Sequence, residues 1–81
     1  MRRFFFDLLV GNVVKIDSGG MVFAHAKATF VVADEMARHL FIWRDDLRDC
    51  EAAIRVRDDG GREIYRAPVW ADTAEKAGWE T

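Results

Sequence analysis

The chain has 81 residues, 51% of them hydrophobic, and its 12 Lys and Arg against 14 Asp and Glu give a formal net charge of -2. This length fits a single domain, and the apolar content is too high for intrinsic disorder. A net charge near zero provides no bulk attraction to nucleic acid or to an anionic membrane surface. Any such binding would depend on local segregation of charge.

Cysteine content and the first residues bear on the cellular compartment. Cys50 is the single cysteine, so an intrachain disulfide is excluded and a reducing compartment is expected. Arg2 and Arg3 before three Phe give the start some likeness to a signal peptide, but Asp7 interrupts the apolar run too early for export. No stretch approaches the 18 apolar residues of a membrane span. The sequence therefore predicts a cytoplasmic protein with no membrane segment.

The first 20 residues predict a β-hairpin. Residues 3–10 contain three aromatic residues and end in a β-forming residue, and their apolar side chains fall on both faces, which favours a central strand. Gly11-Asn12 is typical of a tight turn. Residues 13–16 then form a short second strand, which ends at the polar, glycine-containing segment 17–20.

Residues 24–43 predict an amphipathic helix. The segment contains no Gly or Pro, and at 100° per residue its apolar and charged side chains fall on opposite arcs. The apolar arc covers about half the circumference, which is wider than the core-facing stripe of roughly 100°. No Ser, Thr, Asp or Asn directly precedes Ala24, so the start of the helix is poorly marked.

A second hairpin is predicted after the helix. Residues 52–57 alternate between apolar and arginine side chains at their end, the period of a half-buried strand. Asp58-Asp59-Gly60-Gly61 is a strong turn signal, and residues 62–69 continue as the next strand. Pro68 favours an edge or terminal position there. Residues 70–81 form either one short helical turn or a frayed tail.

These elements predict an α+β fold with a single ββαββ domain over residues 1–69 and a C-terminal tail over 70–81. The helix is expected to cover one face of a four-stranded, mainly antiparallel sheet, which makes two layers. Placing the first strands of the two hairpins side by side keeps all neighbours antiparallel and predicts the strand order 2-1-3-4. The covered face is expected to carry Phe4, Phe6, Leu8, Val14, Ile16, Ile54 and Val56.

The order of these segments resembles a known family. Arg-Phe-Phe-Phe-Asp-Leu at 3–8, the 17–20 turn, the Ala-rich helix, Ile-Arg-Val-Arg-Asp at 54–58 and Gly-Arg-Glu-Ile at 61–64 are similar to short, mostly alpha-proteobacterial proteins filed as domain of unknown function 6894. The resemblance covers about residues 2–69. Many members have an acidic or Pro-Asp segment where this chain has residues 21–23, and the tail has no counterpart. The resemblance implies the fold and a bacterial cytoplasmic setting, and brings no catalytic or ligand residues with it.

No motif in the sequence indicates catalysis, a metal or a cofactor. His25 and His39 lie about 21 Å apart on the predicted helix, too far to share one metal ion. Cys50 stands between Asp49 and Glu51, which oppose formation of a thiolate. The acidic segment 45–51 lacks the spacing of a calcium loop, and no phosphate-binding loop occurs. We therefore expect a protein that is not an enzyme.

Two surfaces are candidates for binding. The first is the margin of the wide apolar arc, which favours a protein-interaction or homodimerising module because so small a domain has limited area in which to bury it. Alternatively, the tail covers this margin within the monomer. The residues of this candidate partner interface are Phe30, Val31, Phe41, Ile42 and Trp70.

The second surface is the open face of the sheet, which suggests nucleic-acid binding as the alternative function. Basic side chains around an exposed aromatic ring suit single-stranded nucleic acid, through phosphate contacts and base stacking. Asp7 on the same face and the net charge count against it, and a solvated charged face is common. The residues of this candidate face are Arg3, Phe5, Lys15, Arg55 and Arg57.

Overall fold

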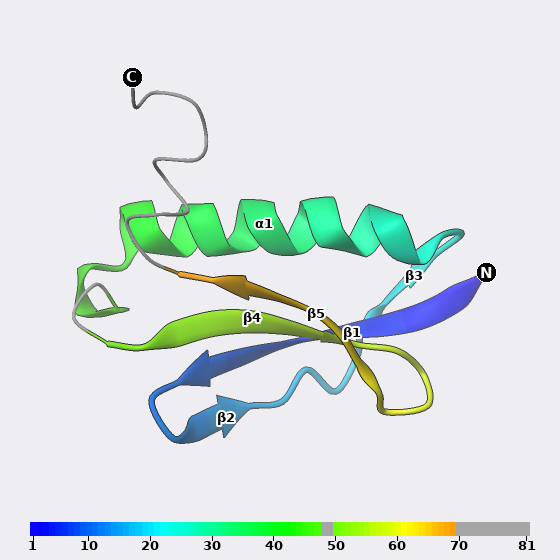
Figure 1. The fold of residues 1–81 in the computed structure, drawn as a ribbon, viewed down its shortest axis with the longest axis horizontal. Helices are drawn as coiled ribbons and strands as arrows, with labels where there is room; N and C mark the ends of the chain where they lie inside the picture. The colour runs from blue at the N-terminus through cyan, green and yellow to red at the C-terminus, as the bar shows by residue number, and fades with distance from the viewer. Residues whose placement is uncertain (48–49, 70–81) are drawn as a thin grey trace.

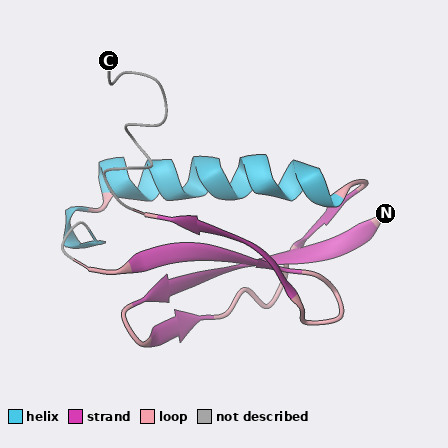
Figure 2. Cartoon of the chain, viewed as in Figure 1, coloured by secondary structure: helices cyan, strands magenta, loops and turns pink. Residues whose placement is uncertain are grey.

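The structure is a computed structural model that describes residues 1–47 and 50–69, so the predicted tail and Trp70 lie outside the described residues. One helix lies across one face of an antiparallel sheet (Figure 1), and strands make up most of the remaining described chain (Figure 2). The predicted two-layer α+β fold is confirmed. The elements are β1 (Arg2–Val10), β2 (Val13–Lys15), β3 (Met21–Phe23), α1 (Ala26–Trp43), a 3₁₀ turn (Asp45–Leu47), β4 (Ala52–Arg57) and β5 (Glu63–Pro68).

The sheet has the order β2-β1-β4-β5, and β3 also pairs with β1. The predicted order 2-1-3-4 agrees with this path, because the two hairpins meet through β1 and β4. The prediction of four strands was wrong in one respect, since β3 is a fifth. β1 spans nine residues and takes two partners in succession, β3 along Arg2–Phe4 and β2 along Leu8–Val10.

The core lies between the sheet and α1. Phe4 of β1 and Ile54 and Val56 of β4 are almost fully buried, and Ala33 and Ala37 bring the helix close to the sheet because their side chains are small. The helix packs mainly on β4 and β5 and less on β1. The part of β1 nearest β2 is therefore less fully covered by the helix.

Aromatic contacts lie on two sides of the core between the sheet and α1. The ring of Phe23 in β3 packs against Phe4 and Phe6, with ring centroids 6.1 and 5.9 Å apart. On the other side, Phe30 of α1 stacks on Tyr65 of β5 at 4.4 Å, and the Tyr65 hydroxyl donates to Asp34 at 2.8 Å. These contacts anchor α1 over β5 and leave the opposite margin of the helix beside the β2–β3 side of the sheet.

Candidate functional site

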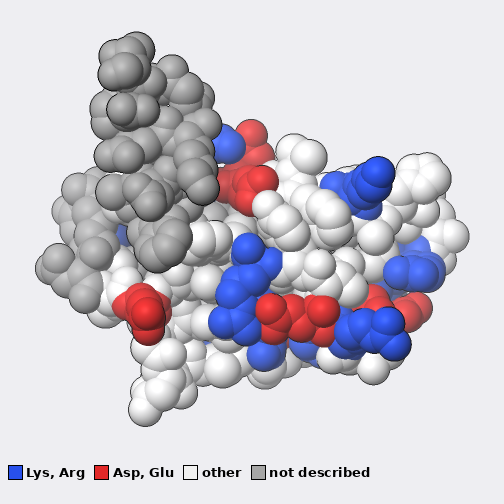
Figure 3. Space-filling view, viewed as in Figure 1, with Lys and Arg blue, Asp and Glu red and all other residues white. Residues whose placement is uncertain are grey.

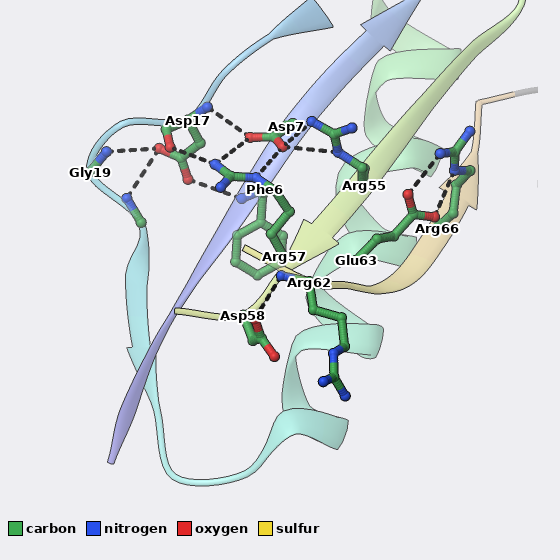
Figure 4. Close-up of polar contacts among 11 residues, drawn as sticks. Phe6, Asp7, Asp17, Gly19, Arg55, Arg57, Asp58, Arg62, Glu63 and Arg66 are labelled. Atoms are coloured by element: carbon green, nitrogen blue, oxygen red, sulfur yellow. Dashed lines mark hydrogen bonds and ion pairs between the residues drawn. The ribbon is translucent and has the colours of Figure 1, made fainter. Parts of the chain in front are cut away.

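A loop at residues 16–20 separates β2 from β3 along the same side of β1. In Figure 4 the segment that carries Asp17 and Gly19 runs along one side of β1, and the strand that carries Arg55 runs along the other. The Asp17 carboxylate accepts hydrogen bonds from the backbone N–H groups of Phe6 at 3.1 Å, Gly19 at 3.2 Å and Gly20 at 3.1 Å. A side chain thus replaces the missing strand partner of Phe6, which satisfies a backbone donor that the interrupted ladder would leave unpaired.

Asp7 is fully buried on the face of the sheet opposite α1. Its Oδ2 accepts from Arg55 Nε and Nη2 at 3.0 and 2.7 Å and from Arg57 Nε at 2.6 Å, and Arg57 Nη2 lies 3.2 Å from Oδ1. The Asp17 N–H donates to the same carboxylate at 2.9 Å. Figure 4 shows both guanidinium groups turned toward Asp7. We call Asp7, Asp17, Arg55 and Arg57 the Asp7 cluster; it contains two carboxylates and two guanidinium groups.

The electrostatics of the Asp7 cluster keep both carboxylates ionised. Burial by itself raises the pKa of Asp7, but hydrogen bonds from Arg57, from the Asp17 N–H and from Arg55 outweigh it and hold the pKa at about 2, against an ordinary value of 3.8. Burial also opposes ionisation of Asp17, whose pKa is nevertheless lowered by the N–H groups of Phe6, Gly20 and Gly19. The hydrogen bond to Asp7 in turn raises the pKa of Arg57.

The lowered pKa of Asp7 predicts a loss of stability in acid. A carboxyl group with a lower pKa in the folded than in the unfolded state stabilises the fold above the unfolded value of about 3.8 and loses that effect as the pH falls toward about 2. The difference corresponds to roughly 2 kcal/mol. We expect the free energy of unfolding, measured by urea titration, to fall by at least this amount between pH 5 and pH 2. An Asp7→Asn variant with the same decline would contradict the assignment to Asp7.

The predicted nucleic-acid face is only partly assembled. Phe5, Arg55 and Arg57 do lie together, with the Arg57 guanidinium 4.9 Å from the centroid of the Phe5 ring. However, both arginines bind Asp7, and Arg3 donates to the Gly19 carbonyl at 2.8 Å. Their charges are therefore largely used within the domain. Figure 3 shows a side of the molecule, with α1 above the sheet as in Figure 1, and there too acidic and basic side chains alternate in one row. Nucleic-acid binding stays an untested expectation.

The predicted position of Lys15 was wrong. Lys15 pairs with Leu8 and Val14 pairs with Leu9. Directly opposed residues share a face of the sheet, so Lys15 lies on the helix side and Val14 on the open side. The faces of Val14 and Lys15 are the reverse of those predicted because the turn after Val10 pairs Val10 with Val13. A shift of one residue in the register moves every side chain of a strand to the other face.

The predicted partner interface on the helix is not one continuous surface. Phe30 stacks on Tyr65, and Phe41 is half-buried against the core. Val31 and Ile42 are exposed but lie eleven residues, or about 16 Å, apart along α1. Trp70 lies outside the described residues.

Exposed apolar side chains gather instead along β2 and β3. Five described residues there are each close to half exposed or more, with fractions from 46 to 64%. They occupy the outer side of the sheet, beyond β1, and sequence reasoning did not combine them because it assigned no strand to residues 21–23. We call this set the β2–β3 edge: Val13, Val14, Ile16, Met21 and Val22.

An apolar groove lies beside this edge on the helix side. Its volume is about 400 Å³. Side chains of β1, α1, the ends of β2 and β3 and the loop between them form its walls, and we call it the Lys15 groove. Its lining consists of the apolar residues Phe6, Leu8, Ile16, Met21 and Met36 and the polar residues Lys15, Asp17 and Ser18.

Comparison with known proteins identifies the family. Residues 3–70 match the family model described as Domain of unknown function (DUF6894). The chain belongs to this family. The resemblance noted from the sequence is thereby confirmed, and its alpha-proteobacterial source stays a prediction. No curated protein and no solved structure matches the chain.

Two further observations concern this DUF6894 domain. Among the described residues, no helix is long and apolar enough to cross a membrane. Within the same residues, no three His, Cys, Asp or Glu side chains are grouped as metal ligands. Sequence reasoning missed the Asp7 cluster, although an aspartate inside an apolar strand and two arginines at alternate positions of another strand were a usable signal.

Proposed function

We propose that the protein is a non-catalytic interaction module that forms a homodimer through the β2–β3 edge. The observation that carries the proposal is the row of exposed apolar side chains on an edge that is also short of backbone partners. Unpaired N–H and C=O groups at an edge strand are a template for a further strand, and apolar side chains beside them strengthen the contact. Exposed apolar clusters of this kind often mark interaction surfaces.

The sequence of β2 favours a second copy as the partner. A two-fold axis brings the same surface of both subunits together, so a dimer strand must be complementary to itself. If two β2 strands pair antiparallel about Val14, Val14 faces its own copy and Lys15 faces Val13 of the other subunit. The two lysines are then not directly opposed, which avoids a repulsive like-charge pair. The two sheets would continue as one.

This proposal moves the interface from the helix margin to the sheet edge. Phe30 and Phe41 already contribute to packing within the monomer. Val31, which is 63% exposed, has charged and polar neighbours in Glu35 and His39 one and two turns along the helix. The β2–β3 edge combines more exposed apolar side chains with backbone groups that can pair.

The test is the oligomeric state of three proteins in solution. Sedimentation equilibrium from about 5 to 500 µM, a span that brackets micromolar association, should show a dimer for the native chain. Val14→Lys places a charge at the centre of the proposed contact and should give a monomer, because edge lysines oppose strand pairing. Val31→Lys is the matched control, since it adds the same charge at an exposed apolar position on α1, and should remain dimeric.

Two outcomes would contradict the proposed function. A native chain that is monomeric over the whole concentration range would rule out the homodimer. A dimer that Val31→Lys dissociates and Val14→Lys leaves intact would assign the interface to the helix. Circular dichroism of both variants checks that the fold is retained.

A further inference from the structure

We propose that the Lys15 groove binds a single-chain aliphatic carboxylate. The groove shares Ile16 and Met21 with the β2–β3 edge but lies on the helix side of the sheet, and its proposed ligand differs in kind from a second protein chain. The groove combines three features that such a ligand requires: an apolar wall, a volume suited to a small molecule, and a positive charge at the polar part of its lining.

The apolar wall comes from three parts of the fold. Phe6 and Leu8 project from β1 toward the helix side, Met36 faces them from α1, and Ile16 and Met21 close the side next to the sheet edge. The volume of about 400 Å³ falls within the roughly 300–1,000 Å³ of small-molecule pockets. Two of the five wall residues are methionines, whose flexible side chains adapt readily to an aliphatic chain.

The packing of the helix accounts for the groove. α1 is held over β4 and β5, where Tyr65 both stacks on Phe30 and donates to Asp34. The helix therefore covers β1 less fully, and Leu8 remains only partly buried although it faces the helix side. An aliphatic chain in the groove would bury this remaining apolar surface, which is the source of the expected affinity.

Lys15 determines the sign of the ligand's charge. It makes no ion pair within residues 1–47 and 50–69, and it is exposed. The carboxylate of Asp17, which also lines the groove, is already engaged by three backbone N–H groups. Because the Asp7 cluster contains as many guanidinium groups as carboxylates, its charges balance. The ammonium group of Lys15 is therefore the charge left for an anionic head group, with which it forms a charge-assisted hydrogen bond.

The probes are octanoate and decanoate below their micelle concentrations and decanol below its solubility limit, added to the ¹⁵N-labelled full chain and followed by amide chemical shifts. Saturable shifts are expected at Leu8, Ile16 and Met36. Decanoate should bind up to about 15-fold more tightly than octanoate, since each added methylene contributes about fourfold. Decanoate should also bind about fivefold more tightly than decanol because only the carboxylate pairs with Lys15.

Lysine variants test the role of the charge. Lys15→Met keeps an unbranched apolar side chain and removes the ammonium group, so it should abolish the preference for decanoate over decanol while decanol binding persists. Lys27→Met is the matched control, because Lys27 is an exposed lysine on α1 that does not line the groove, and should keep the preference.

The proposal is overturned if decanoate causes no saturable shifts, if the shifts lie outside the groove, or if both lysine variants lose the preference equally. The titration is repeated on Val14→Lys, whose substitution lies on the other face of the sheet. Binding that persists in this variant supports a site independent of the proposed dimer. Failure of either proposal is then distinguishable from failure of the other.

Discussion

Replacing Asp7 with asparagine is expected to lower the free energy of unfolding by about 3–5 kcal/mol, the usual cost of removing one partner of a buried ion pair. The side chain of Asp7 is fully buried, whereas those of Arg55 and Arg57 are each 22% exposed. Asparagine preserves the shape but removes the carboxylate to which both guanidinium groups donate hydrogen bonds. Since a domain of this length is stabilised by only about 4–12 kcal/mol in total, the variant should be close to unfolding. Urea denaturation at pH 7 measures the loss.

Glu63→Gln is the matched control for this substitution. It also removes one carboxylate that binds an arginine, Arg66 at 2.8 Å, on the same sheet. Both side chains are at least 40% exposed, so the change should cost less than about 1 kcal/mol. If the two variants lost the same free energy of unfolding, burial of Asp7 would not be the reason that the Asp7 cluster contributes more stability than an exposed ion pair.

Gly20→Ala is expected to destabilise the fold by about 2–4 kcal/mol. Gly20 has a φ of +67°, and a Cβ atom there would lie 2.6 Å from the carbonyl oxygen of Phe4 and 2.9 Å from two ring carbons of Phe5. An alanine must therefore adopt an unfavourable backbone conformation and also displace the backbone of β1. Because the N–H of Gly20 binds Asp17, the shift would disturb the contact that holds the 16–20 loop.

Gly11→Ala separates the backbone effect from the steric one. Gly11 has a similar φ of +59°, but a Cβ atom there would meet nothing within 4 Å. Its replacement should cost only the backbone term of about 1–2 kcal/mol. The difference between the midpoints of thermal unfolding of the two variants measures the steric effect at Gly20. Equal midpoints would show that β1 shifts to accept the added methyl group without loss of stability.

The 16–20 loop connects the stability of the domain to its candidate sites. Through Asp17 it binds β1 and the buried Asp7, and it divides the outer edge into two strands of three residues. Short edge strands limit indiscriminate pairing with other chains. A contact through β2 would therefore be short and would depend on its apolar side chains, which is why one lysine at Val14 is expected to abolish it.

Much of the fold was predictable from the sequence because its signals are local. The alternation at the end of residues 52–57 and the absence of Gly and Pro from residues 24–43 predicted the strand and the helix close to their observed bounds. Turn residues marked both hairpins. If the two hairpins pair antiparallel through their first strands, few strand orders of the sheet remain possible. The observed order was therefore also predictable. β3 was not predicted because three residues are too few to show the alternation of a strand.

The candidate sites were less predictable because they depend on contacts between distant segments. Lys15 was assigned to the wrong face because the register of a three-residue strand is set by its turn. The hydrogen bonds of Asp7 reach 48 and 50 residues along the chain. An aspartate inside an apolar strand and two alternating arginines mark candidates for such a contact, but only the tertiary structure shows that they meet and that Asp7 is buried.

The sequence by itself determined the class of the domain, its helix, its two hairpins and its family, because periodicity and turn chemistry act within a few residues. Tertiary structure decided which charges remain available and which apolar side chains remain exposed. Arg55 and Arg57 became internal partners of Asp7, whereas Lys15 remained without an acidic partner in the described chain. Because α1 packs mainly over β4 and β5, the β2–β3 edge carries five exposed apolar side chains in addition to those that α1 itself exposes.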